Sequence, residues 1–182
     1  LMRKSNEIFY SLQGEGFHTG TPAVFVRFSG CNLKCSFCDT QHEEGVWMSD
    51  EEILAEVGKY PAVTVILTGG EPSLWIDREF VDCLHWMGKY VCIETNGTHS
   101  LPDNIDWVTC SPKQGAKLCI SRMDEVKVVY EGQDIAVYES LPAGHFFLQP
   151  CSCSNTAETV ACVMQHPKWR LSLQTHKLIE IT

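Results

Sequence analysis

Three cysteines stand close together in the stretch GCNLKCSFCDTQH, which covers residues 30–42. Cys31, Cys35 and Cys38 are separated by three and then two residues, directly after a run of β-type residues. Thiolates select zinc or iron–sulfur clusters. A structural zinc site needs a fourth ligand to complete its tetrahedron, and His42 is within reach in sequence. A four-iron cluster with three thiolate ligands would instead leave one iron open to a small molecule.

Four further polar motifs each follow a β-type run directly. They are TGGEPS (68–73), ETNGT (94–98), CSPK (110–113) and QPCS (149–152). Parallel strands bring their carboxyl ends to one edge of a sheet, which is where (β/α) barrels carry their functional residues. We therefore expect these motifs and the cysteine loop to face one site.

Six short apolar, β-branched or aromatic runs predict the strands that position the motifs. They cover residues 22–29, 63–68, 90–95, 106–110, 125–130 and 145–149. Helices are predicted over 49–60, with Ser49 and Glu52 as a capping box, over 77–89, and over 155–167, opened by Asn155 with Glu158. The gaps after the fourth and fifth strands are short and lack periodicity, so full helices are not expected there. This alternation predicts an α/β fold, a partial, open TIM-like (β/α)6 barrel with some helices shortened or missing.

Composition limits the class of protein. A chain of 182 residues with 44% apolar residues suits one domain, residues 1–182, with its own core. The chain has a net charge of -9 and so lacks the excess of basic residues that binding to phosphate backbones requires. No nucleic acid partner is therefore expected. No apolar run is long enough for a membrane span and the first residues contain no signal core, so we expect a cytoplasmic protein.

The chain has ten cysteines, which without an export signal predict free thiols rather than a disulfide framework. Five of them are expected to be small buried hydrophobes: Cys83, Cys92, Cys110, Cys119 and Cys162. The CxC pair Cys151 and Cys153 is too tight for a usual zinc pair and has no further cysteine pair nearby. We expect these two to be local structural thiols.

The motifs together resemble a known family. CNLKCSFC resembles the CxxxCxxC cluster motif of radical S-adenosylmethionine (radical SAM) enzymes, and TGGEP resembles the glycine-rich motif of the same superfamily. SLQGEGFHTGTPAVFVRFSGCNLKCSFCDT (11–40), ETNGT, CSPK and the closing LSLQTHKLIEIT are together similar to the 7-carboxy-7-deazaguanine synthase family. The resemblance runs from about residue 8 to the last residue. The chain ends in Thr182, where family members often end in proline.

The resemblance implies a reaction and its cofactors. A carbon–nitrogen lyase of this family contracts the ring of 6-carboxy-5,6,7,8-tetrahydropterin to 7-carboxy-7-deazaguanine with loss of ammonia, on the route to queuosine and other 7-deazapurines. It uses a 4Fe-4S cluster, SAM as a catalytic cofactor, and Mg2+. It also implies a flavodoxin or ferredoxin as electron donor and a homodimer.

The resemblance also implies roles for individual residues. Cys31, Cys35 and Cys38 would hold the cluster, Thr40 would contact Mg2+, and residues 170–182 would close the substrate site. SAM contacts are expected from Phe37, Asp39, Gly70, Glu94, Ser111, Pro112, Lys113 and Gln149. Substrate contacts are expected from Leu12, Gln13, Gly14, Glu15, Arg27, Thr68, His176 and Thr182. No catalytic residue is required beyond the cofactor, with Glu15 and His176 as candidates for handling a proton.

Two alternatives remain at this level. Another small radical SAM enzyme, such as an activase that places a glycyl radical on a partner protein, would keep the cluster and SAM but lack the pterin pocket. A zinc-stabilised binding module would lack catalysis altogether. Metal binding by His42 would favour the zinc module over the cluster.

Overall fold

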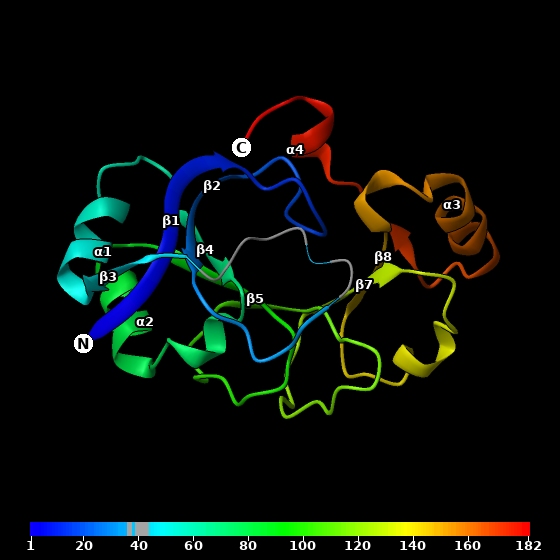
Figure 1. The fold of residues 1–182 in the computed structure, drawn as a ribbon, viewed down its shortest axis with the longest axis horizontal. Helices are drawn as coiled ribbons and strands as arrows, with labels where there is room; N and C mark the ends of the chain where they lie inside the picture. Colours follow the sequence, from blue (N-terminus) through cyan, green and yellow to red (C-terminus); the bar gives the residue numbers. More distant parts are fainter. Residues whose placement is uncertain (36–37, 39–43) are drawn as a thin grey trace.

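The computed structural model describes residues 1–35, 38 and 44–182. Its main feature is one curved sheet whose strands run in the order β3-β1-β2-β4-β5-β6-β7-β8-β9. The sheet forms an open arc, with the helices α1 (Asp50–Val57) and α2 (Arg78–Trp86) toward one end and α3 (Thr156–Gln165) toward the other (Figure 1). The expected open, partial barrel is thus confirmed.

All six predicted strands are present. They are β2 (Pro22–Phe28), β4 (Thr64–Gly69), β5 (Tyr90–Thr95), β6 (Trp107–Cys110), β7 (Glu125–Tyr130) and β8 (His145–Pro150). Each of these strands pairs in parallel with the next. Their carboxyl ends, and the polar motifs that follow them, therefore lie at one edge of the sheet.

Three strands were not predicted. The long β1 (Met2–Leu12) runs antiparallel to β2, and β3 (Val46–Ser49) runs antiparallel to β1. The short β9 (Arg170–Leu171) extends the other edge in parallel with β8. The sequence of β1 does not show the apolar pattern of a strand, because its buried positions are occupied by Arg3 and Ser5 rather than by apolar residues.

The predicted helices are confirmed, with one correction to their capping. The capping box of α1 is complete, since Ser49 Oγ accepts from Glu52 N at 3.2 Å and Glu52 Oε2 accepts from Ser49 N at 2.7 Å. Asn155 precedes α3 but does not cap it. Its side chain instead accepts from Cys151 N at 2.8 Å and donates to Tyr130 O at 2.7 Å.

The two gaps expected to lack full helices do lack them. Residues 111–124, between β6 and β7, are all described and contain no helix. Between β7 and β8 there is only the 3-10 turn η2 (Ala136–Tyr138). Two further 3-10 turns, η1 (Pro72–Leu74) and η3 (Cys151–Cys153), follow β4 and β8 directly. None of the helices in the described part of the chain has the length and apolar run that crossing a membrane requires.

The strands alternate between two hydrophobic clusters. One face of β2 packs Val24, Val26 and Phe28 into the larger cluster, which the helices cover. The opposite face places Ala23 and Phe25 with residues of β4 and β5 in a smaller cluster inside the arc. Residues at alternate positions of each strand therefore point into the arc.

The cysteines outside the loop are all free, but they are not equally buried. Cys92 and Cys110 are buried as expected, and burial raises the pKa of Cys110 to about 12. Cys83 and Cys162 are only half-buried. The prediction that Cys119 is a buried hydrophobe is wrong, because this residue is exposed in the irregular segment after β6.

The loop between β1 and β2 closes the amino-terminal end of the arc. Phe17 from this loop stacks on Trp107, the first residue of β6, with ring centroids 4.8 Å apart, and packs at a tilt against His145, the first residue of β8, at 4.4 Å. Glu125, the first residue of β7, is buried beside them, and one of its oxygens accepts from Phe17 N at 3.2 Å. Its other oxygen has no hydrogen-bond partner among the described residues.

A buried arginine joins the edge of the sheet to two helices. Arg3 of β1 is fully buried, and its guanidinium bonds Asp50 at the start of α1 at 2.6 Å and Asp77 at the start of α2 at 3.0 Å. It also lies 4.3 Å above the ring of Phe80. One side chain thus fixes the starts of two helices relative to β1.

Replacing Arg3→Ala is expected to lower the free energy of unfolding by about 2–3 kcal/mol, because two carboxylates lose their buried cation but keep partial contact with water. Denaturant unfolding measures this change. Arg78→Ala is the matched control, since Arg78 pairs with Asp103 at the exposed surface and such pairs contribute about 0–1 kcal/mol. Equal losses in the two variants would contradict the structural role given to Arg3.

Glu125 is expected to make stability depend on pH. Burial raises its pKa, although Lys127 and Phe17 N partly offset this. The stability that Glu125 contributes is therefore full below its unfolded pKa and is lost as pH rises through the higher folded pKa. Glu125→Gln should then raise the melting temperature at mildly alkaline pH, with a smaller difference in acid.

Thermal unfolding followed across this pH range measures the effect. Glu131→Gln, at an exposed position, is the control and should show no such pH-dependent gain. A Glu125→Gln variant that is stabilised equally at every pH would show that ionisation of this carboxyl is not the cause.

Candidate active site

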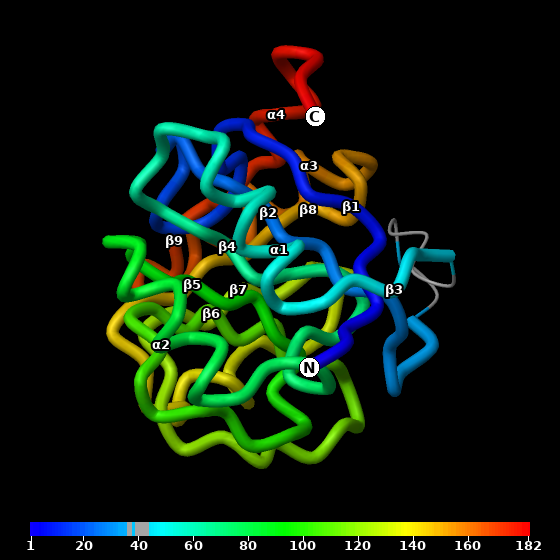
Figure 2. Tube along the Cα trace, turned by 90° about the vertical axis from the view of Figure 1, so that its left-hand side faces the viewer, coloured from blue at the N-terminus to red at the C-terminus, as the bar shows by residue number. Residues whose placement is uncertain are grey.

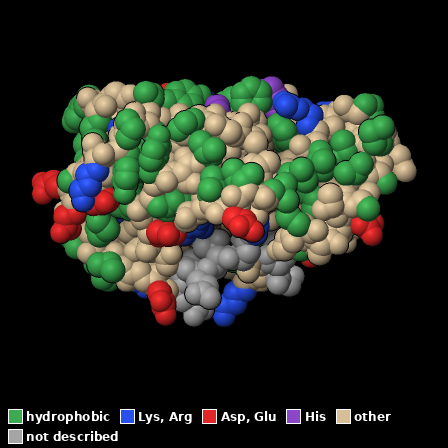
Figure 3. Space-filling view, turned by 90° about the horizontal axis from the view of Figure 1, so that it is seen from above, with side chains coloured by type: hydrophobic (Ala, Val, Ile, Leu, Met, Phe, Trp, Pro, Cys, Tyr) green, Lys and Arg blue, Asp and Glu red, His purple; other side chains and the backbone are tan. Residues whose placement is uncertain are grey.

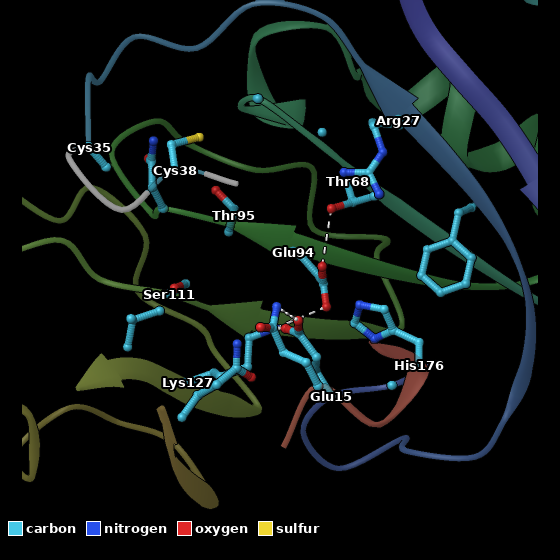
Figure 4. A pocket seen from close by; sticks show the side chains of 18 of the residues that line it. Glu15, Arg27, Cys35, Cys38, Thr68, Glu94, Thr95, Ser111, Lys127 and His176 are labelled. Carbon is cyan, nitrogen blue, oxygen red and sulfur yellow. Dashed lines mark hydrogen bonds and ion pairs between the residues drawn. The ribbon is translucent and has the colours of Figure 1, made fainter. Parts of the chain in front are cut away.

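A cavity of about 260 Å³ opens at the carboxyl ends of the parallel strands. Figure 4 shows side chains from β2, β4, β5, β7 and the C-terminal segment pointing into it. All eight residues predicted to contact the substrate line this cavity, as do the cluster cysteines and five of the residues predicted to contact SAM: Gly70, Glu94, Ser111, Lys113 and Gln149. Thus most of the predicted site residues come together in one place.

Four of the predicted positions are not in this set. Pro112 is buried and lines a neighbouring hollow with Tyr138 and Leu141. Phe37, Asp39 and Thr40 lie outside the described residues, as does His42. Their predicted roles stay predictions.

The three thiols of Cys31, Cys35 and Cys38 all line the cavity and form no disulfide. Burial raises the pKa of the Cys31 thiol, while a hydrogen bond from Leu33 N at 3.5 Å acts in the opposite direction. In residues 1–35, 38 and 44–182, no three His, Cys, Asp or Glu side chains are already gathered around one point as a metal site. Three free thiols on one cavity wall fit the donor set of an iron–sulfur cluster.

The glycine pair of TGGEP lets the end of β4 approach the start of the cysteine loop. A Cβ on Gly70 would lie 2.1 Å from Gly30 O and 3.1 Å from Cys31 N, so no other residue fits without movement. The backbone adds two bonds here, from Gly70 N to Phe28 O at 3.0 Å and from Glu71 N to Gly30 O at 2.9 Å. The backbone at this motif therefore makes a close approach, and its partner is the start of the cysteine loop.

The Glu71 side chain ties this turn to the end of β5. Its carboxylate is fully buried and accepts from Thr95 Oγ1 at 2.6 Å and from Asn96 N at 2.7 Å. The Asn96 amide then donates to Asn32 Oδ1 at 3.1 Å, beside the first cysteine. The motifs TGGEPS and ETNGT thus support one wall of the cavity together.

A polar network occupies the centre of the cavity. Glu94 from β5 accepts from Gln13 Nε2 at 3.1 Å and from Thr68 Oγ1 at 3.1 Å. Lys127 from β7 bonds both Glu15 and Glu94, the latter at 3.3 Å (Figure 4). Glu94, predicted to contact SAM, is thus held by two residues predicted to contact the substrate, and it stands where the two sides meet.

Burial and pairing set the charges in this network. Burial alone would raise the pKa of Glu15, but Lys127, Gln174 and His176 more than offset it, so the pKa lies below its usual value. Burial alone would lower the pKa of Lys127, but Glu15 and Glu94 more than offset it and raise the pKa. Both groups are therefore charged at neutral pH.

Lys113 places a half-buried ammonium on the cavity wall and donates to Ser111 Oγ at 2.7 Å. Burial lowers its pKa, an effect that the nearby Cys35 and Cys38 partly oppose.

The QGEG turn is held by the C-terminal segment. Gly14 O accepts from Thr175 N at 2.9 Å, and Gly16 N donates to Ser172 Oγ at 2.9 Å. A Cβ on Gly14 would lie 2.0 Å from His176 Nδ1, and one on Gly16 would lie 2.0 Å from Glu125 Oε1. Both glycines of the motif are therefore required by close packing, and Glu15 between them is fixed.

The end of the chain lies against the same turn. The short helix α4 (Thr175–Leu178) and the terminus stand above the body of the sheet, near the end of β1 (Figure 2). Thr182 O accepts from Ser11 Oγ at 2.5 Å, and both His176 and Thr182 line the cavity. The end of β1 and the C-terminal segment thus contribute to one wall.

Arg27, the inward-facing residue near the end of β2, is half-buried on the opposite wall. Its Nε lies 3.5 Å from Glu7 Oε2 and its guanidinium lies 5.7 Å from the ring centre of Phe9. Arg27 thus both forms an ion pair with Glu7 and lines the cavity.

Sequence reasoning gave no individual role to several residues of the cavity, although Cys151 lies in QPCS, and Ser172 and Gln174 lie in residues 170–182. Lys127, Gln174 and Cys151 line the cavity, and Ser172 supports it by donating to Gln149 Oε1 at 2.9 Å. A signal for Lys127 was available, because a charged residue in the middle of an apolar strand of a parallel sheet must be paired or functional. For Ser172 and Gln174 the sequence offers no such signal.

The face seen from above carries many hydrophobic side chains, with basic and acidic ones interspersed (Figure 3). This face shows no concentration of Lys and Arg of the kind that binds phosphate backbones.

Comparison with known proteins agrees with the site. The radical SAM superfamily model matches residues 25–109, and this superfamily implies a 4Fe-4S cluster and SAM. The 7-carboxy-7-deazaguanine synthase of Bacteroides thetaiotaomicron is 81% identical over 181 residues, covering 100% of both chains. That of Nitratidesulfovibrio vulgaris is 42% identical and covers 96% of this chain and 97% of the relative.

A solved structure supports the same assignment. QueE from Escherichia coli is 31% identical and covers 94% of this chain and 93% of its own, with a TM-score of 0.79. These likenesses do not favour the activase or the zinc-module alternative. The chain belongs to the 7-carboxy-7-deazaguanine synthase family of the radical SAM superfamily.

Proposed function

We propose that the cavity converts 6-carboxy-5,6,7,8-tetrahydropterin to 7-carboxy-7-deazaguanine and ammonia. The observation that carries this proposal is the meeting of three free thiols with a buried polar network in one cavity. Substrate and product differ by ammonia alone, so the reaction has no net oxidation. This balance suits a cofactor that is regenerated in each cycle.

When bound, the cluster and SAM supply a carbon-centred radical that removes a hydrogen atom from carbon 6 of the substrate. The chain binds and orients the substrate and the cofactors, and it excludes water from them. Cys31, Cys35 and Cys38 hold the cluster. Phe37, Asp39, Gly70, Glu94, Ser111, Pro112, Lys113 and Gln149 hold SAM. The position of Glu94 beside Gln13 and Thr68 supports a role at the boundary with the substrate.

The opposite side of the cavity holds the substrate. Arg27 pairs with its carboxylate, because a guanidinium can bond both oxygens at once. Leu12, Gln13, Gly14 and Glu15 present backbone and side-chain groups to the flat ring, whose edge has donors and acceptors. Thr68, His176 and Thr182 complete the wall. Glu15 and His176 are the groups placed to hold a proton.

Mg2+ is proposed to enter with the substrate, held by Thr40, the substrate carboxylate and water, since magnesium keeps waters and uses few protein ligands. We also propose a flavodoxin or ferredoxin as the low-potential electron donor, a homodimer and a cytoplasmic location.

The activity is tested anaerobically with reconstituted protein, carboxytetrahydropterin, SAM and a reductant. The expected result is brown protein with about four irons per chain, and both ammonia and 7-carboxy-7-deazaguanine as products. Cys35→Ala should lose iron and turnover. Cys119→Ala, which removes an exposed thiol outside the cavity, should lose neither. Colourless protein with one zinc, or brown protein that forms neither product, would contradict the proposal.

Magnesium is tested by titrating the metal against activity. Thr40→Val should raise the Mg2+ concentration needed for half-maximal activity, because the ion loses a protein oxygen. His42→Ala is the control and should leave both this concentration and the iron content unchanged. Loss of bound metal from His42→Ala would instead show that the loop is a Cys3His site.

A further inference from the structure

Lys127 is placed where a ligand in the cavity would meet it. In β7, Val126 and Val128 point into the helix-covered cluster, so alternation turns Lys127 into the arc. Its side chain is only 7% exposed, and it lines the cavity. The ammonium of Lys127 is therefore shielded from bulk water but can contact a molecule bound in the cavity.

The partners of Lys127 leave part of its ammonium unused. An ammonium has three N–H donors. Among the described residues, the structure records two partners, the carboxylates of Glu15 and Glu94. Because both carboxylates favour the charged form, Lys127 is a cation that can donate but not accept.

Beside this donor stands an acceptor with spare capacity. Glu15 accepts from Lys127 through one oxygen and from Gln174 Nε2 at 2.9 Å through the other. Each carboxylate oxygen has two lone-pair sites, so both oxygens can accept once more. The Lys127–Glu15 pair therefore offers two acceptors next to one donor, on one side of the cavity.

Two acceptors beside one donor are complementary to one edge of a fused pyrimidinone ring. A 2-amino-4-oxo ring presents its 2-amino group and its ring N3–H as adjacent donors, followed by the 4-oxo oxygen as an acceptor. A 2,4-diamino ring presents a donor in place of that oxygen, and its N3 carries no hydrogen and becomes an acceptor. Facing an ammonium, the second ring would leave two donors opposed and unpaired inside a buried site.

We propose that Lys127 is a specificity-determining residue, which donates to the 4-oxo oxygen of the ring while Glu15 accepts from N3–H and the 2-amino group. This inference rests on the proposed function, since it concerns how the same cavity reads its substrate. The product keeps the same ring edge, so Lys127 contacts the substrate and the product in the same way.

The test compares two stable ligands that share the fused ring and the carboxylate, 6-carboxypterin and 2,4-diaminopteridine-6-carboxylate. Their affinities are measured by fluorescence titration of cluster-loaded protein, without oxygen and at mildly alkaline pH. The natural chain should prefer the 4-oxo ligand by about 100-fold or more, because a site built to bond one group strongly rejects an analogue that leaves it unpaired.

Two variants separate specificity from folding. Lys127→Met removes the donor, and the preference should fall by about tenfold or more, while Glu15 keeps its own preference for N3–H. Lys127→Gln gives the two carboxylates an amide donor and can either donate to or accept from the ring, so its preference should fall to the same level. Lys117→Met, at an exposed position outside the cavity, is the control and should keep the full preference.

Each outcome decides the question. Equal binding of the two ligands by the natural chain would overturn the role of Lys127 even if both variants failed to fold. A folded variant that kept the full preference would also overturn it. If the natural chain bound neither ligand, the proposed function would fail, and this inference with it.

Discussion

The buried ammonium of Lys127 lies between two carboxylates, and the position of the cavity walls depends on these ion pairs. Lys127 is held from β7, Glu94 from β5 and Glu15 from the loop after β1, so a single charge cluster joins segments far apart in the chain. Leaving any of these charges alone inside the arc would be costly, because buried ions require partners. The position of the loop is therefore fixed by electrostatics as much as by packing.

Predicting the fold from the sequence worked where burial dominates. The strands β2 and β4 to β8 are rich in apolar residues and largely buried, which makes them recognisable without any knowledge of their neighbours. β1 was missed because its buried residues include Arg3, whose burial depends on carboxylates supplied by two distant helices. The prediction that Asn155 caps α3 was wrong for a similar reason. The Asn155 side chain donates to the backbone of Tyr130 and does not bond its own helix.

The site was predictable where backbone geometry demands a residue type. The glycines of QGEG and TGGEP are needed because a Cβ would collide with a neighbouring segment, and that requirement is readable as a motif. The supporting residues were not predictable in this way. Ser172 matters because its hydroxyl happens to stand between Gly16 N and Gln149, a relation that exists in space and not in sequence.

The contact between the QGEG turn and residues 172–176 also sets the order in which the site can form. The turn belongs to the first part of the chain to be made, whereas the residues that hold it follow every parallel strand of the arc. During synthesis the thiol loop and the strand ends can be in place while the wall beside Glu15 is still missing. The wall beside Glu15 is thus completed only after residues 172–176 have been made.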